Sequence, residues 1–315
     1  MRDCAWFGEI SRLDVSLAGG KGANLGDMAQ AGHPIPPGFV ICAPAFRKML
    51  ECSGLDLSID ELMQGLERNN FNQLQEIEHQ ARHLVENAPF PDELRSMVNE
   101  AYRELGDHVP VAVRSSATAE DCASASFAGQ QETFLNVVGQ EQLLQAIQRC
   151  WSSLYTPQAM FYRVQNGFDT CQVSMAVVVQ KMINSEKSGV IFTVDPVLRN
   201  HFQMVIEAVW GLGEGIVSGT ITPDHYLVDR ETCEVISEFV PEKQIMITKD
   251  RPGGVQTTPV PADRVARPVL TPGELRQLVD LGNKVERHFG SPQDIEWGIE
   301  GGQIYLLQSR PITSL

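Results

Sequence analysis

A short stretch near the end of the chain carries carboxylate, amide and guanidinium groups at spacings that could hold a metal-bound polyphosphate. It covers residues 293–310 and is predicted to form two short strands joined at a pair of glycines. Hard oxygen ligands hold Mg²⁺, and the forked guanidinium of an arginine grips phosphate oxygens. The side chains concerned are Asp294, Glu296, Gln308 and Arg310.

The loop length of this hairpin decides whether those side chains share a face. A two-residue loop would place Glu296 opposite Leu307 and mix polar with apolar side chains on both faces. A three-residue loop, residues 301–303, instead pairs Glu296 with Gln308, and we expect this longer loop. The opposite face is then expected to be apolar and to carry Ile295, Trp297, Ile299, Tyr305 and Leu307. An amphipathic edge hairpin with a surface ion pair would show the same alternation.

Glycines surround a lysine near the start of the chain. Gly-Gly-Lys-Gly occupies residues 19–22, and Leu25 and Met28 follow at helical spacing. We therefore expect Lys21 to lie where a loop enters a helix, and exposed N–H groups with a cation form an anion site there. The spacing is not that of a Walker motif, and a plain glycine loop is the alternative.

An arginine lies at the end of a strand that is predicted to be buried, and small residues follow the arginine. Arg114 leads into a run of serines, alanines and a threonine, and a second run of small residues leads through Gly129 to Thr133. Small side chains let backbone approach a ligand, and hydroxyl groups can cap phosphate oxygens. From the residues alone, a structural ion pair of Arg114 with Glu120 or Asp121 fits equally well.

The composition favours a globular protein and bounds its partners. The chain has 315 residues, 43% of them hydrophobic, which suffices for one large domain or two lobes. A formal charge of −15 argues against nucleic acid and membrane surfaces as partners, because both call for basic patches. Seven cysteines without a C-x-x-C spacing favour reduced thiols in a cytoplasm, and neither a leader nor a membrane span is expected.

Periodicity and turn residues predict the elements that position these stretches. We expect helices over residues 60–67, 72–86, 91–105, 141–155, 157–165 and 271–290, the last opened by a capping box. Strands are expected over residues 173–182, 188–195 and 203–210, a hairpin region over 224–248 and a Gly/Pro-rich connection over 249–268.

The change from helices to antiparallel strands near residue 182 predicts a boundary between two lobes, residues 1–182 and 183–315. A cleft between lobes is a natural nucleotide site. The strand that ends at Gln180, Lys181 and Met182 could offer backbone groups to an adenine edge there.

Six motifs, in order along nearly the whole chain, closely resemble the nucleotide-binding domain of phosphoenolpyruvate synthases. These enzymes belong with pyruvate phosphate dikinases and rifampin phosphotransferases, all of ATP-grasp type. The motifs occupy residues 19–26, 113–121, 126–136, 211–214, 294–297 and 308–311. The resemblance implies an α+β fold with ATP between two lobes, and it favours phosphate binding over the structural alternative at each stretch.

The resemblance also implies a reaction and a role for each residue. In the family, the β-phosphoryl group of ATP passes through a pyrophosphorylated histidine to a histidine of a separate swivelling domain, with release of AMP and phosphate. Lys21 and Arg114 would neutralise the developing charge, and Asp294 would support the site. The implied ligands are Glu296 and Gln308 for Mg²⁺, Arg310, Thr133 and the Gly129 loop for phosphates, and Gln180, Lys181 and Met182 for adenine.

The family's phosphohistidine lies in a Thr-Ser/Cys-His segment beyond the motif that contains Arg310. None of the seven histidines lies in such a context. The expectation is therefore a domain or subunit that carries the histidine, as in phenylphosphate synthases, with this chain either an excised domain or a separate subunit. Pyruvate, phenol and rifamycin are all open as final acceptors. A regulatory module that holds ATP without turnover is the alternative from another class.

Overall fold

The computed structural model describes residues 2–63, 71–118, 132–165, 174–250 and 253–313. Its chain divides into two compact units: unit 1 comprises residues 1–30 and 37–182, and unit 2 comprises residues 31–36 and 183–315. Two contacts attach the short segment 31–36 to unit 2. Leu306 N donates to Pro34 O at 2.9 Å, and the His33 and His288 rings lie 5.6 Å apart.

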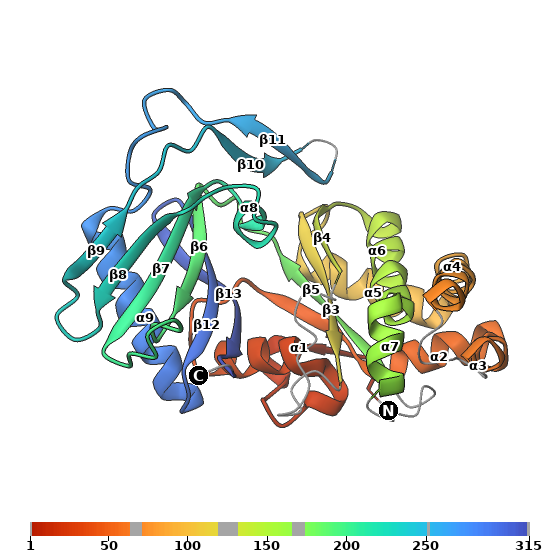
Figure 1. Ribbon diagram of the computed structural model, residues 1–315. Helices are drawn as coiled ribbons and strands as arrows, with labels where there is room; N and C mark the ends of the chain where they lie inside the picture. The colour runs from red at the N-terminus through yellow and green to blue at the C-terminus, as the bar shows by residue number, and fades with distance from the viewer. Residues whose placement is uncertain (1, 64–70, 119–131, 166–173, 251–252, 314–315) are drawn as a thin grey trace. The chain divides into compact units, whose positions relative to one another are not determined.

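Unit 1 combines an antiparallel sheet with helices, shown in red to green in Figure 1. The described strands run in the order β1-β2-β5-β3-β4, and they are β1 Cys4–Trp6, β2 Gly38–Ile41, β3 Val111–Ala117, β4 Thr133–Val137 and β5 Met175–Lys181. The helices are α1 Val15–Gln30, α2 Ala43–Ser53, α3 Asp56–Met63, α4 Phe71–Glu86, α5 Asp92–Leu105, α6 Gln140–Ser152 and α7 Pro157–Gln165, with short 3₁₀ turns at Phe7–Glu9 and Ser153–Tyr155.

The core of unit 1 lies between one face of this sheet and helices α2 to α6. Trp151 of α6 is fully buried, and its ring lies 5.6 Å from those of Phe46 and Phe90. Val113 of β3 and Val179 of β5 face the same cluster. Because strand side chains alternate, the neighbouring residues of β3 and β5 point to the opposite face, where α1 packs.

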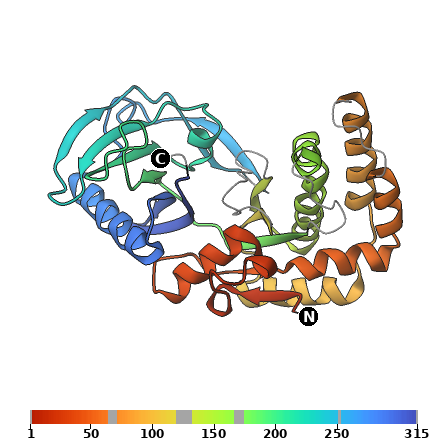
Figure 2. The same cartoon turned by 60° about the horizontal axis from the view of Figure 1, so that its bottom comes forward.

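Unit 2 is built on a six-stranded antiparallel sheet. A long helix lies along one face of this sheet (Figures 1 and 2). The strand order is β13-β12-β6-β7-β8-β9, and the strands are β6 Lys187–Phe192, β7 Gln203–Trp210, β8 Asp224–Asp229, β9 Val235–Phe239, β12 Gln293–Glu300 and β13 Gln303–Pro311. A separate hairpin contains β10 Ile245–Lys249 and β11 Val255–Pro259, and α8 covers Glu214–Val217. Both sheets are antiparallel among the described strands, so the expected α+β class is confirmed.

Helix α9, Pro272–Phe289, covers the core face of the unit 2 sheet and leads into β12. Thr271 Oγ1 accepts from Glu274 N, and Glu274 Oε2 accepts from Thr271 N at 2.7 Å, so the expected capping box is confirmed. Gly282 lies against Met204 and Ile191, where an added Cβ would come within 3.4 Å of both side chains. This helix therefore fixes the position from which the hairpin starts.

Several expected boundaries shift in the structure. Strand β11 lies inside the stretch expected to be an irregular connection, because Ile245–Lys249 and Val255–Pro259 pair in register. Helix α2 was not expected, and α3 begins at Asp56 instead of residue 60. Among the described residues, no helix is both long enough and apolar enough to cross a membrane.

A buried ion pair ties the region after β9 to the sheet of unit 2. Lys243 and Asp224 form a salt bridge with both side chains at most 1% exposed. Asp224 Oδ2 also accepts from Val269 N at 2.6 Å and from Tyr226 Oη at 3.1 Å. The carboxylate is therefore paired through both oxygens, which is what a buried charge requires.

Removal of this lysine should destabilise the protein strongly. We expect Lys243→Met to lower the free energy of unfolding by about 3–5 kcal/mol, because it leaves the Asp224 charge buried without its cation. The double variant Lys243→Met/Asp224→Asn should recover part of the loss, since it removes the buried charge as well. Urea unfolding followed by circular dichroism measures both. A Lys243→Met midpoint equal to that of the wild type would show that the pair contributes nothing.

Candidate functional site

Lys21 lies just after a kink in α1. Gly19 has non-helical angles, φ 66° and ψ 171°, so the second helical segment starts at Gly20 and Lys21 lies in its first turn. The loop expected before Lys21 is therefore a kink at Gly19 inside α1, whereas the expected start of a helical segment at Lys21 is present. An added Cβ at Gly19 would come within 2.3 Å of Ser116 O, so only glycine allows this approach to β3.

Hydrogen bonds fasten the start of this second helical segment to β3. Lys21 Nζ donates to Ser115 O at 3.3 Å, and Gly22 N donates to Ser116 Oγ at 3.2 Å. Ser116 Oγ in turn donates to Ala18 O at 2.9 Å. The lysine is half-buried. The kink therefore holds an ammonium group beside the strand that carries Arg114.

Arg114 shares one face of the unit 1 sheet with two other expected site residues. It lies directly opposite Thr133 of β4 and Val178 of β5, and Gln180 lies two residues further along β5 from Val178. Directly opposed residues, and residues two apart in one strand, point to the same face. Arg114 is 8% exposed, Gln180 is 2% exposed and Thr133 is exposed. Arginine, hydroxyl and amide groups thus line the face on which α1 and Lys21 lie.

The residues expected to meet adenine end β5 with their amide groups already engaged. Lys181 N donates to Pro37 O and Met182 N donates to Pro110 O, both at 2.9 Å. A base bound here would therefore donate to carbonyl oxygens, and any donor to the base would have to be a side chain. Gly129, Glu120 and Asp121 lie outside the described residues.

The hairpin pairing confirms one expectation and overturns another. Asp294 pairs with Arg310 and Glu296 with Gln308, as expected. The loop, however, has two residues, because Glu300 pairs with Gln303 and both intervening glycines have positive φ. A β-bulge between Glu296 and Trp297 shifts the pairing register by one residue, so that Glu296 still lies opposite Gln308. The predicted three-residue loop is therefore wrong, although the pairs it was invoked to explain are present.

The bulge also changes which residues of β13 face the core. Ile304 pairs with Ile299 and Leu306 with Trp297, and each of these side chains is at most 3% exposed. The expectation that Tyr305 and Leu307 belong to the core face is wrong, and both are half-buried. Before the bulge the even-numbered residues of β13 face the core, and after it the odd-numbered ones do.

The face opposite the core carries an ion pair beside the carboxylate and amide. Arg310 Nε and Nη2 both lie 2.8 Å from Asp294 Oδ2. Asp294 is 13% exposed at its side chain and Arg310 is 53% exposed. Burial raises the pKa of Asp294 above its ordinary 3.8, Glu296 adds to the rise, and Arg310 opposes it. The arginine therefore limits the rise in the pKa of Asp294 beside Glu296.

Removal of this arginine should raise the pKa of Asp294 further. A carboxyl group whose pKa is higher in the folded than in the unfolded chain contributes stability at low pH, and this is lost as the pH rises through the raised pKa. We therefore expect Arg310→Ala, relative to the wild type, to lose more stability between pH 4 and pH 7, whereas Arg310→Lys should resemble the wild type. Carboxyl NMR titration of Asp294 checks the direction. A lower pKa in Arg310→Ala would contradict this account.

Glu296 and Gln308 offer two of the oxygen ligands that a magnesium site needs. Glu296 is half-buried and Gln308 is 8% exposed. A carboxylate and an amide oxygen fit Mg²⁺, which keeps several non-protein oxygens in its octahedral shell. Among the described residues no group of three His, Cys, Asp or Glu side chains could hold a metal by itself. The arrangement therefore suits a metal that arrives with phosphate oxygens.

Sequence reasoning missed two residues that continue this face across the sheet. The ladder places Glu296 opposite Val190, Val190 opposite Glu207 and Glu207 opposite His225. His225 Nδ1 lies 3.6 Å from Glu207 Oε1. The period-two alternation of β7 could have identified Glu207 as an outward residue, but only the strand order places it in this row.

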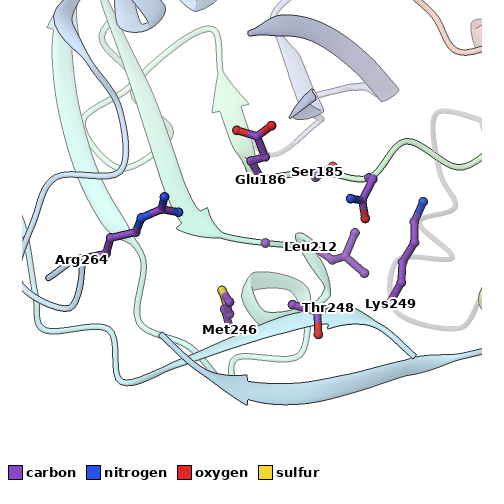
Figure 3. A pocket seen from close by; sticks show the side chains of 9 residues that line it. Ser185, Glu186, Leu212, Met246, Thr248, Lys249 and Arg264 are labelled. Carbon is purple, nitrogen blue, oxygen red and sulfur yellow. The ribbon is translucent and has the colours of Figure 1, made fainter. Parts of the chain in front are cut away.

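Unit 2 also contains a cavity of about 310 Å³ beside the turn at Gly211 (Figure 3). Leu212 N donates to Ile247 O at 2.9 Å, which joins this turn to β10. The lining includes one carboxylate, two cations and a hydroxyl group, from Glu186, Lys249, Arg264 and Thr248. Burial lowers the pKa of Lys249. The cavity therefore presents groups of both charges together with the apolar side chains of Leu212 and Met246.

Comparison with known proteins places these features in a family. Residues 15–315 match the family model described as pyruvate phosphate dikinase, AMP/ATP-binding domain. Over 100% of its length the chain is 47% identical to the probable phosphoenolpyruvate synthase of Methanocaldococcus jannaschii, covering 27% of that protein. It is 44% identical over 99% of its length to the probable phosphoenolpyruvate synthase of Methanothermobacter thermautotrophicus, covering 46% of it.

A relative with a different named activity is similar over the same region. The chain is 39% identical over 98% of its length to the rifampicin phosphotransferase of Bacillus cereus, and it covers 36% of that protein. The chain thus spans between about a quarter and just under half of the length of these curated relatives.

Proposed function

The chain belongs to the pyruvate phosphate dikinase AMP/ATP-binding domain family, and we propose that it binds Mg²⁺-ATP and uses it for phosphoryl transfer to a histidine. The carrying observation is the pairing of Glu296 with Gln308 on one face of the hairpin, beside the ion pair of Asp294 with Arg310. This face supplies metal ligands and a phosphate-binding cation together, which neither a core hairpin nor a random surface requires.

We propose that the two units are the lobes of an ATP-grasp fold and that their polar faces act on one ATP molecule. Lys21 and Arg114 of unit 1 would neutralise charge that develops on the transferred phosphoryl group. Thr133 and the Gly129 loop would contact phosphates, and the end of β5 at Gln180, Lys181 and Met182 would meet adenine. The support is geometric: Arg114, Thr133 and Gln180 share one face of a sheet whose strand β3 is hydrogen-bonded to α1 at Lys21.

In unit 2, Glu296 and Gln308 would hold Mg²⁺, and the metal ion would offset the negative charge of the phosphates. Arg310 is 53% exposed, so its guanidinium can reach a phosphate while Nε and Nη2 stay on Asp294. Asp294 would keep Arg310 in place through Oδ2, which accepts from both Nε and Nη2. Phosphoryl transfer needs such positioning and charge stabilisation more than it needs a covalent protein intermediate.

The proposed products are AMP and phosphate, with the β-phosphoryl group left on a histidine of another domain or subunit and the γ-phosphoryl group transferred to water. The names of the relatives differ in the activity they state, so the final acceptor stays open between pyruvate, phenol and rifamycin. All three fit the same first half-reaction, because the histidine separates ATP chemistry from the acceptor. The matched region therefore needs no acceptor site of its own.

Product formation tests this proposal. As acceptor probe we would use full-length phosphoenolpyruvate synthase of M. thermautotrophicus with its own ATP-binding segment inactivated by substitution. The chain, Mg²⁺ and ATP labelled at the β-phosphate should yield AMP and an acid-labile label on the probe, and the probe alone should yield neither. Tight ATP binding without AMP, with or without the probe, would instead identify a non-catalytic nucleotide-binding module.

A further inference from the structure

Unit 2 presents an apolar pocket on the face of its sheet that carries Glu296 and Gln308. This pocket, here called the β6–β8 pocket, has a volume of about 420 Å³, and its apolar lining comes from Phe192, Pro196, Val197, Leu198, Val205 and Leu227. Val197 is 85% exposed and Leu198 is 70% exposed. Large aliphatic side chains exposed together around a hollow mark an interaction site more often than a single exposed leucine does.

The turn that carries these two side chains has a defined shape. Asp195 Oδ1 accepts from Val197 N at 2.8 Å and from Leu198 N at 3.0 Å. Asp195 and Asn200 also exchange backbone hydrogen bonds at 3.2 and 3.3 Å. The apolar side chains are therefore held out by a closed turn, and burying them would not require the turn to refold.

The β6–β8 pocket is continuous with the face that carries the metal ligands. Phe192 in the pocket lies directly opposite Asp294, and Glu207 and His225 lie in the ladder row of Glu296. With adjacent strands about 4.8 Å apart, three strand spacings separate Glu296 from His225 by about 14 Å. A protein interface that buries about 800 Å² on each side spans such a distance.

The chemistry of the pocket excludes the nucleotide as its occupant. Its ionisable lining consists of Asp195, Glu207 and His225, and the two carboxylates repel phosphate. A polyphosphate would also leave the exposed aliphatic side chains uncovered. An apolar centre with a carboxylate at its edge instead fits a protein segment that inserts an apolar side chain and places a cation at Glu207.

We propose that the β6–β8 pocket docks the histidine-bearing domain or subunit during phosphoryl transfer, an inference that rests on the proposed function. Such a partner has to bring its histidine to the phosphate beside Glu296, and this pocket is the adjoining apolar surface on that face. The relatives provide room for such a partner, because the matched region covers only 27–46% of their lengths.

The test separates docking from ATP binding. The double variant Val197→Ser/Leu198→Ser keeps both N–H groups that bond to Asp195, so we expect it to fold and to bind Mg²⁺-ATP like the wild type. Its affinity for the acceptor probe, measured by interferometry without ATP, should fall at least about tenfold. The matched control is Leu57→Ser in α3, where a leucine is 71% exposed, and it should bind the probe like the wild type.

Each outcome decides one of the two proposals. Unchanged probe affinity in the double variant, or no binding of the probe by the wild type, overturns the docking surface. Loss of affinity to the same extent in Leu57→Ser does so too, as does self-association of the wild type that the double variant abolishes. Binding that depends on Val197 and Leu198 but yields no AMP and no labelled probe would overturn the proposed function and leave the surface standing.

Discussion

Replacement of Arg114 by alanine is expected to slow phosphoryl transfer by ~10²–10⁴-fold, because it removes a preorganised charge that stabilises the transition state. The side chain is 8% exposed and lies on the face of β3 that α1 covers. Its charge therefore cannot be replaced by bulk water. Single-turnover formation of AMP with the acceptor probe measures the effect.

Arg114→Lys is the matched control for that variant. It keeps the charge but loses the forked donor geometry, so we expect a rate between those of wild type and Arg114→Ala. Lys21→Ala should show a loss of the same order, and its urea midpoint should report whether the contact with Ser115 O also stabilises the kink. Wild-type rates in either alanine variant, with an intact fold, would refute the assigned roles.

Replacement of Glu296 by alanine should weaken ATP binding chiefly when Mg²⁺ is scarce. Loss of residues that merely support a metal ligand typically costs 10–100-fold in metal affinity, so we expect at least about tenfold for the carboxylate itself. The comparison is Glu238→Ala, which removes an exposed carboxylate from β9 of the same sheet. ATP affinity measured across a Mg²⁺ titration shows the effect. An unchanged affinity at limiting Mg²⁺ would remove Glu296 from the metal site.

The hairpin shows how a pattern can predict contacts and miss the geometry behind them. The alternation of polar and apolar residues indicated that Glu296 faces Gln308, and this is confirmed. The same alternation could not show that a bulge, and not a longer loop, restores the register. A bulge leaves one residue unpaired without changing the order of side chains, so sequence spacing alone cannot separate the two cases.

The residues of the unit 1 site could be predicted from the sequence, but their arrangement in space could not. Lys21 and Ser115 are 94 positions apart, and only the packing of α1 on β3 brings them within hydrogen-bond distance. The kink at Gly19 was predicted as a loop because its glycines disrupt helical spacing. The close approach to Ser116, which glycine alone permits, is a tertiary feature without a local signal.

Calorimetric titration of the chain with ATP at limiting Mg²⁺ tests most directly whether the two polar faces act on one nucleotide. The account predicts one ATP per chain, bound more weakly by both Arg114→Ala and Glu296→Ala, with the stoichiometry unchanged in each. Two binding events in the wild type, or full affinity in either variant, would show that Arg114 and Glu296 do not act on the same ATP.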